Sequence, residues 1–250
     1  MENALILFFF VLGIIFGSFF NVAGLRVPKR EPFVNDRSHC PNCGQSLSWY
    51  DLIPVLSFIF LRGKCRDCGK RISFIYPVVE LATGFFFSFS YIHIGLNVEL
   101  IIALTLVSML MILFVSDVHY MLIPNRILLF FLPVFIILRM INPLDPWWDS
   151  IAGGIIALVL LAVIIVVSKG GMGGGDMKLF GLLGIVLGTE KVLLSFFLAT
   201  LIGALFGGLL LVFRIVGRKQ EVPFGPYIIV GALLAYYYGD DIIYWYFNLV

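Results

Sequence analysis

Long apolar runs, separated by short polar or glycine-rich breaks, limit most strongly what this chain can fold into. Most of them reach the roughly 20 residues that a helix needs to cross a bilayer. Of all residues, 61% are hydrophobic and 13% are charged, whereas soluble domains carry roughly 25% charged residues. We therefore predict an all-α polytopic membrane protein with about eight transmembrane helices, at about 4–25, 72–95, 98–116, 125–141, 150–168, 177–189, 191–215 and 225–246.

The run at 177–189 is shorter than the others. A helix of its length covers only about 20 Å, less than the hydrocarbon core of a bilayer. We expect this helix to thin the membrane or to end in a break of the chain.

The basic residues indicate how the chain lies in the membrane. If the N-terminus is outside, all of the 17 basic residues except Arg139 and Lys191 fall in the inward loops 26–71, 117–126, 169–178 and 214–222. The positive-inside rule therefore predicts that both termini are outside and that these loops are cytoplasmic. The net charge of +2 is too small to suggest a nucleic acid as partner. The lipid bilayer is the partner that the composition implies.

All four cysteines lie in the first inward loop, in two Cys-x-x-Cys-Gly motifs. Cys40 and Cys43 form the first pair, and Cys65 and Cys68 repeat it 25 residues later in similar surroundings. We predict two similar hairpins that together hold a tetrahedral zinc ion. Two disulfides are the alternative, which a reducing cytoplasm disfavours. A loop this short builds little core, so the metal would supply much of its folding energy.

These observations divide the chain into three parts. Residues 1–25 form a first transmembrane helix, which we expect to be retained because no basic residue precedes the run and no small-residue cleavage site follows it. Residues 26–71 form a small cytoplasmic zinc-binding loop domain. Residues 72–250 form a membrane core of about seven helices.

Two aspartates lie where apolar runs meet the predicted cytoplasmic face. Asp176 follows three glycines, Gly173 to Gly175, and Asp117 closes the third run. A flexible linker with a helix cap, and a solvated helix end, are the simpler interpretations. However, a carboxylate at the end of an apolar helix is disfavoured by the helix dipole, and an ionisable group at the edge of a membrane span suggests function. Because the predicted topology places both aspartates at one face, they can meet.

Two neighbouring carboxylates share a proton, because both cannot ionise cheaply. The ionised one can activate water while the protonated one donates to a carbonyl oxygen or a leaving nitrogen. This is aspartyl peptidase chemistry, and a glycine strip beside the acid lets an extended substrate backbone approach. Glu80 and Asn21 lie deeper in their runs, where they could bind substrate or bond within the bundle. His119 is a weaker candidate for a third catalytic group.

The motifs resemble those of the prepilin peptidase (type IV leader peptidase) family along nearly the whole chain. The matching segments are Gly-Ser-Phe-Phe-Asn-Val (17–22), the paired cysteine motifs, Ile-Ser-x-x-Tyr-Pro-x-x-Glu (72–80), Asp117 with Ile-Pro (123–124), Gly-Gly-Gly-Asp-Met-Lys-Leu (173–179) and Pro-Phe-Gly-Pro (223–226). Each motif alone is weak, but their order is specific to the family. The resemblance implies a GxGD-type aspartyl protease of the bacterial plasma membrane, with Asp117 and Asp176 as its catalytic pair.

The resemblance also implies substrates, cofactors and further site residues. Family members cut the short basic leader of prepilins and pseudopilins at the cytoplasmic face, and bifunctional members methylate the new N-terminus with S-adenosylmethionine. Candidates for substrate binding are Gly173, Gly174, Gly175, Lys178 and Glu80. Gly63, before Cys65, is the candidate for methyl transfer. Both a monomer and a homo-oligomer are compatible with the sequence.

Three alternatives remain open at this point. Many longer family members carry an insertion before the first cysteine pair that this chain lacks, so a peptidase without methyltransferase activity is one alternative. A proton-coupled transporter is another, but it predicts repeat symmetry and polar groups near the midplane, and neither is visible here. A scaffold whose zinc loop binds assembly proteins would leave the Gly-Gly-Gly-Asp segment unexplained.

Overall fold

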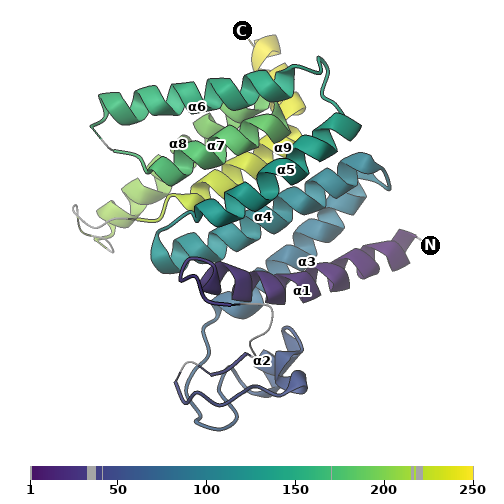
Figure 1. The fold of residues 1–250 in the computed structure, drawn as a ribbon, viewed down its shortest axis with the longest axis vertical. Coiled ribbons are helices and arrows are strands. Elements are labelled where there is room, and N and C mark those ends of the chain that lie inside the picture. The colour runs from purple at the N-terminus through teal and green to yellow at the C-terminus, as the bar shows by residue number, and fades with distance from the viewer. Residues whose placement is uncertain are drawn as a thin grey trace. The chain divides into compact units, whose positions relative to one another are not determined.

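The computed structural model describes residues 2–32, 38–40, 42–169, 171–214, 217 and 222–249. These residues form helices, with only two isolated β-bridges among them. The long helices are α1 (Glu2–Arg26), α3 (Ile75–Ile94), α4 (Val98–Tyr120), α5 (Asn125–Ile141), α6 (Asp149–Val167), α7 (Gly174–Leu187), α8 (Thr189–Val212) and α9 (Gly225–Leu249) (Figure 1). Two short helices, η1 (Trp49–Leu52) and α2 (Leu56–Phe60), lie in the loop with the cysteines.

The helical class predicted from the sequence is confirmed, and each apolar run corresponds to one long helix. Within the described residues, five helices are long and apolar enough to cross a membrane: α1, α3, α4, α6 and α8. Helices α5 and α7 have 17 and 14 residues. The count of eight transmembrane helices is therefore approximate.

The chain forms two compact units, Met1–Val115 and Ser116–Val250. In the first unit, α1 and α3 pack with their backbones in close contact. A Cβ atom at Gly13 would lie 2.7 Å from the Cα atom of Gly84, and one at Gly17 would lie 2.8 Å from the Cα atom of Glu80. Small residues at such positions let membrane helices approach closely, so these glycines define the contact between α1 and α3.

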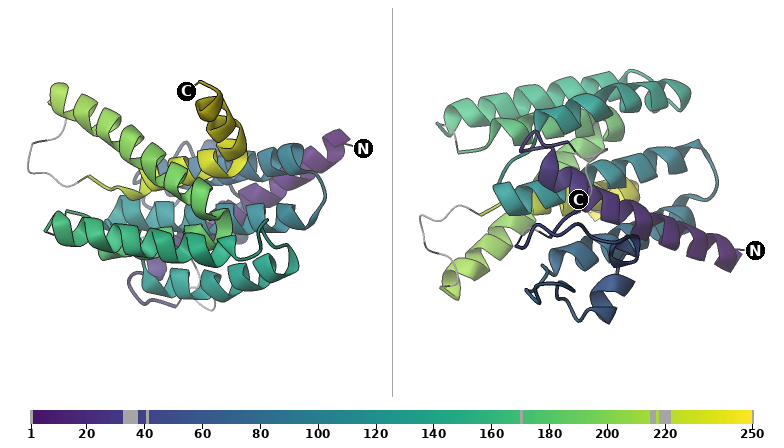
Figure 2. Two further views of the ribbon diagram at one scale, coloured as in Figure 1. Left: turned by 90° about the horizontal axis from the view of Figure 1, so that it is seen from above. Right: turned by 60° about the horizontal axis from the view of Figure 1, so that its bottom comes forward.

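The second unit is built around α7. Side chains all round this helix are buried, including Leu179, Phe180, Leu183 and Val186, as expected for a helix that is apolar on every face. Helix α6 lies beside it (Figure 2). Gly188, with φ of 80°, ends α7, and α8 begins at the next residue. The short run thus ends in a break, one of the two outcomes expected for its length.

Two side chains hold the junction between α7 and α8. The Nη2 and Nε atoms of Arg139 on α5 donate to the Val186 carbonyl at 2.6 and 3.0 Å. Asp149 at the start of α6 accepts from the Thr189 N–H at 3.2 and 3.1 Å. Because helix ends leave carbonyl and N–H groups without helical partners, these contacts satisfy the end of α7 and the start of α8.

Candidate active site

Asp117 lies in the last turn of α4 and is only 5% exposed. Its Oδ2 atom accepts a hydrogen bond of 2.8 Å from the backbone N–H of Gly225, the first residue of α9. The positive end of α9 therefore offsets the unfavourable position of this carboxylate at the negative end of α4. Gly225 was not among the site residues predicted from the sequence. Its only signal there is the Pro-Phe-Gly-Pro segment (223–226), which gives no indication of a contact with Asp117.

Gly225 leaves no space for a side chain. A Cβ atom there would lie 2.5 Å from Oδ2 and 2.8 Å from Cγ of Asp117. Any other residue at position 225 would have to displace the carboxyl group. The glycine thus lets the start of α9 approach Asp117 closely enough to donate its N–H.

Asp176 lies in the first turn of α7, where the helix dipole favours a carboxylate. Its N–H donates to the Gly173 carbonyl at 3.1 Å, which closes the glycine turn. A Cβ atom at Gly173 would lie 3.1 Å from Oδ2 of Asp176. The glycine turn therefore packs directly against the carboxyl group that it precedes.

The turn after Asp117 brings the two aspartates together. Ser116 Oγ donates to the Leu122 carbonyl at 2.6 Å, which folds the chain back at the end of α4. A Cβ atom at Gly175 would lie 3.0 Å from the Cβ atom of Ile123, so the start of α7 lies against this turn. Asp117 and Asp176 are close enough for their charges to interact. Neighbouring carboxyl groups can share a proton, because both cannot ionise cheaply.

The other residues of the second unit that the sequence singled out lie close in the chain to Asp117 or Asp176. Lys178, two residues after Asp176, donates to Asn125 Oδ1 at 3.1 Å and is exposed. Gly174 has open space around it, with no atom within 4 Å of a would-be Cβ. His119 is exposed beside the ring of Tyr120.

Glu80 and Asn21 belong to the first unit and form specific hydrogen bonds there. Glu80 is buried in α3, and its Oε2 atom accepts from the N–H of Val55 at 2.8 Å. Val55 precedes α2 and has a φ of 60°, so Glu80 holds an unusual turn of the cysteine loop on α3. Asn21 donates to the Tyr76 carbonyl at 3.1 Å.

The cysteine repeat folds as two matching hairpins, as its sequence predicts. In the first, the Cys40 N–H donates to Gln45 at 2.9 Å, and in the second, the Cys65 N–H donates to Lys70 at 2.8 Å. Each hairpin turns at the glycine after its second cysteine, with φ of 71° at Gly44 and 68° at Gly69. The isolated bridges His39 with Ser46 and Lys64 with Arg71 keep the same offset of 25 residues.

The four sulfur atoms converge and could bind a metal. Cys40, Cys43, Cys65 and Cys68 are free thiols, and their Sγ atoms lie within 4.8 Å of one another. The Sγ atoms of Cys40 and Cys68 are 3.9 Å apart. A tetrahedral zinc ion with Zn–S bonds of about 2.3 Å holds its sulfurs about 3.8 Å apart. Backbone hydrogen bonds from Asn42 and Cys43 lower the pKa of the Cys40 thiol to about 6, whereas desolvation and the neighbouring thiols raise the pKa of Cys43 to about 11. The sulfurs thus share their protons as a group, with Cys40 the first to become the thiolate that binds metals.

Two further residues shape this loop. Gly63 has a φ of 65°, and a Cβ atom there would lie 2.9 Å from Cζ of Phe58. Arg66, inside the second cysteine motif, forms an ion pair of 2.8 Å with Asp51 and lies over the ring of Tyr50. The contacts of Arg66 tie the second hairpin to η1.

Comparisons with known proteins place this arrangement in a family. Residues 11–94 match the profile described as the bacterial peptidase A24 N-terminal domain, and residues 104–208 match that of the type IV leader peptidase family. A Bacillus subtilis protein is 45% identical over 240 residues, which cover 96% of this chain and 97% of the relative. The chain belongs to the type IV leader peptidase family. The first match contains all four cysteines, and the second contains both aspartates.

More distant members of the type IV leader peptidase family align along most of the chain as well. A Vibrio cholerae protein is 34% identical over 254 residues, which cover 95% of this chain and 98% of the relative. Both it and the Bacillus subtilis protein carry the name prepilin leader peptidase/N-methyltransferase. No significant match was found among solved structures.

Proposed function

We propose that this protein is a membrane aspartyl endopeptidase that removes the short basic leader of type IV prepilins and then methylates the new N-terminus. The observation that carries the proposal is the convergence of Asp117 and Asp176 at the ends of α4 and α7. The family membership and the names of its relatives support the same activity. The segregation of basic residues supports cleavage at the cytoplasmic face of a bacterial plasma membrane.

Peptide hydrolysis follows from the protonation of the aspartate pair. One carboxylate takes a proton from water as the water attacks the scissile carbonyl, and the other donates its proton to the carbonyl oxygen. The first then passes the proton that it took from water to the leaving nitrogen as the C–N bond breaks, and the second takes a proton back from a hydroxyl of the tetrahedral intermediate. The Gly225 N–H holds one oxygen of Asp117, which leaves the other oxygen available for proton transfer. The open space at Gly174 supports a role for the glycine turn beside an extended substrate backbone. Lys178 and Glu80 remain candidates for substrate contacts.

The cysteine cluster fits a structural zinc ion. When bound, zinc would supply four bonds that join the two hairpins and much of the folding energy of the loop. Cys40, Cys43, Cys65 and Cys68 would be its ligands. S-adenosylmethionine is the methyl donor in this proposal, and Gly63, in a tight turn between α2 and the second hairpin, is the candidate for that activity.

Mass spectrometry of a co-expressed prepilin tests the proposed function. The prepilin should lose its leader, and its new N-terminus should gain the mass of one methyl group. An uncleaved prepilin would refute the peptidase. Cleavage without methylation would support the alternative of a peptidase that lacks methyltransferase activity.

Replacing Gly175 with valine should reduce cleavage at least about tenfold, because a small misplacement of catalytic groups is costly. The added side chain would meet Ile123 and push the start of α7 away from the turn after Asp117. Initial rates of prepilin cleavage measure the effect. Gly207→Val in α8 is the matched control, since no atom lies within 4 Å of a Cβ there. A normal rate for Gly175→Val would mean that the glycines are only a linker.

Replacing Cys65 with serine should remove the metal. We expect the wild-type protein to carry about one zinc ion per chain and the variant almost none, because a three-sulfur site binds far more weakly. Elemental analysis of purified protein gives the zinc content, and proteolysis of the loop gives its stability. Ser48→Ala is a control in the same loop, since the Ser48 side chain makes no capping hydrogen bond. Metal-free wild-type protein with two disulfides would contradict both the site and its cytoplasmic location.

A further inference from the structure

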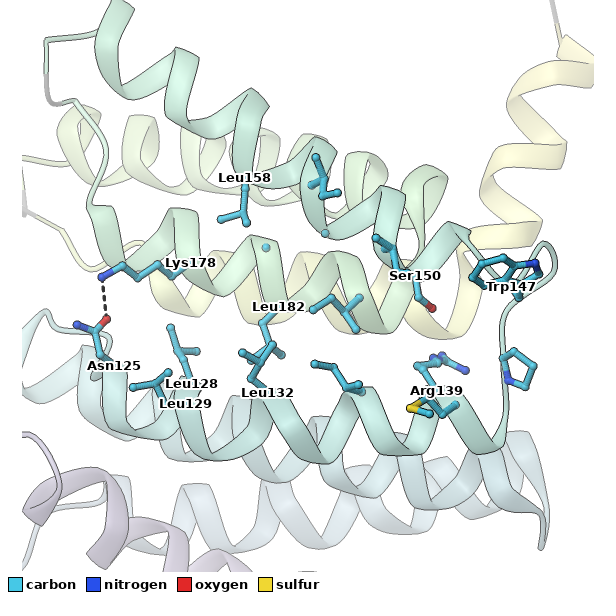
Figure 3. A pocket seen from close by; sticks show the side chains of 18 residues that line it. Asn125, Leu128, Leu129, Leu132, Arg139, Trp147, Ser150, Leu158, Lys178 and Leu182 are labelled. Atoms are coloured by element: carbon cyan, nitrogen blue, oxygen red, sulfur yellow. Dashed lines mark hydrogen bonds between the residues drawn. The ribbon is translucent and has the colours of Figure 1, made fainter.

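A long apolar groove lies in the second unit, with α5 and α6 as its walls and α7 as its floor (Figure 3). Its volume is 1120 Å³. Leucine and isoleucine side chains line most of its length, among them Leu128, Leu132, Leu158 and Leu182. We propose that this groove binds the apolar membrane helix of the substrate that follows the scissile bond. The inference rests on the proposed function, since it places the substrate of that site.

One end of the groove adjoins the aspartate pair. Lys178 and Asn125, joined by a hydrogen bond, form this end (Figure 3). Lys178 is two residues from Asp176, and Asn125 follows directly on Ile123 and Pro124, the turn against which Gly175 packs. The groove therefore begins within two residues of Asp176 on α7 and directly after the turn that follows Asp117.

The dimensions of the groove fit a helix. Along α5 it extends from Asn125 to Arg139, which are 14 helical rises apart, or about 21 Å at about 1.5 Å per residue. This is most of the roughly 30 Å hydrocarbon core that the apolar helix of a prepilin must cross. A helix about 21 Å long and about 10 Å wide occupies on the order of 1,600 Å³. The groove would therefore enclose much of the helix and leave its remaining face towards lipid.

The far end of the groove offers a polar contact that the described residues do not use. Ser150 is only 7% exposed, and its hydroxyl group has no hydrogen-bond partner among the described residues. The hydroxyl points towards the groove (Figure 3). A buried hydroxyl without a partner is costly, and serine side chains in membranes commonly bond to a neighbouring helix. A rotation of the Ser150 side chain would let an incoming helix supply the missing partner.

Photo-crosslinking tests the proposal with adjacent positions of equal or similar exposure. Leu129 and Phe130 on α5 are both 66% exposed, but only Leu129 lines the groove. Ile136 lines it at 43% exposure, whereas Ile137, at 57%, does not. The photo-crosslinker p-benzoylphenylalanine replaces each of these four residues in turn, in an Asp117→Asn variant so that the substrate is not cleaved. The substrate is a prepilin that carries a basic leader and its complete apolar helix. We expect the prepilin to be captured from positions 129 and 136 and not from 130 and 137.

A kinetic variant gives an independent measurement. Leu132→Trp would fill the groove, and we expect it to raise KM at least about tenfold with little change in kcat, since it removes binding that ground state and transition state share. Phe130→Trp is the control on the same helix, and its KM should match that of the wild type.

The outcomes separate the groove from the proposed function. Cleavage by the wild type, with equal capture at all four positions or only at 130 and 137, would overturn the groove and leave the peptidase intact. Capture of lipid alone at 129 and 136, with an unchanged KM for Leu132→Trp, would mean that acyl chains fill the groove. If the wild type does not cleave the prepilin, the proposed function fails and the groove proposal fails with it.

Discussion

Replacing Asp117 or Asp176 with asparagine is expected to lower the rate of leader cleavage by roughly 10²–10⁴-fold or more, because neither half of the acid–base chemistry survives alone. Asparagine keeps the size of the side chain and removes only the ionisable group. It can still accept the Gly225 N–H at position 117, so we expect the fold to persist. Initial rates with a purified prepilin in detergent or vesicles measure the effect.

A distant aspartate provides the control for these substitutions. Asp240 on α9 pairs with Lys191 at 2.7 Å, and its side chain is 84% exposed. Asp240→Asn should insert and cleave normally. Near-normal processing by Asp117→Asn would refute the assignment of the catalytic pair.

Replacing Gly225 with alanine is expected to lower kcat on the order of 100-fold, since a displacement of about 1 Å at a reacting group can cost that much. The new methyl group would collide with the Asp117 carboxyl group and push it from its position against the start of α9. KM should change little, because Gly225 is a positioning residue that acts through Asp117. Steady-state kinetics separate the two parameters.

Gly231 in the same helix is the matched control. A Cβ atom there would lie 2.7 Å from the Ser195 carbonyl oxygen, so alanine at 231 strains the contact of α9 with α8 and leaves Asp117 untouched. We expect Gly231→Ala to lower the unfolding temperature and to keep kcat at temperatures where it is folded. If both variants lose kcat equally, and the loss follows the drop in their unfolding temperatures, Gly225 contributes only to packing.

Patterns that recur along the chain allowed much of the fold to be predicted from the sequence. Long apolar runs predict membrane helices because a segment that crosses a bilayer must form all of its backbone hydrogen bonds internally. The 25-residue repeat predicted the two cysteine hairpins because the fold of each hairpin is determined by residues within its own motif. Alternation of spans across the membrane was enough to predict that Asp117 and Asp176 can meet, although they are far apart in the sequence, and the two are close in the structure.

Contacts between elements that are far apart along the chain could not be predicted from the sequence. The hydrogen bond from Gly225 to Asp117 joins residues 108 positions apart and depends on where the start of α9 lies beside the last turn of α4. Arg139, one of the two basic residues outside the predicted inward loops, holds the end of α7 through Val186. The bond between Glu80 and Val55 arises because a strained turn places one backbone N–H beside a buried acid. Neither hydrophobic periodicity nor motif spacing indicates any of these three hydrogen bonds.

A double-mutant cycle tests most directly whether Asp117 and Asp176 act as one catalytic unit. The rate of prepilin cleavage is measured for the wild type, Asp117→Asn, Asp176→Asn and the protein with both substitutions. Residues that act as a unit are strongly non-additive, so we predict that the double variant is about as slow as either single variant. Full cleavage by either single variant, or a double variant whose loss equals the product of the two single losses, would contradict the account.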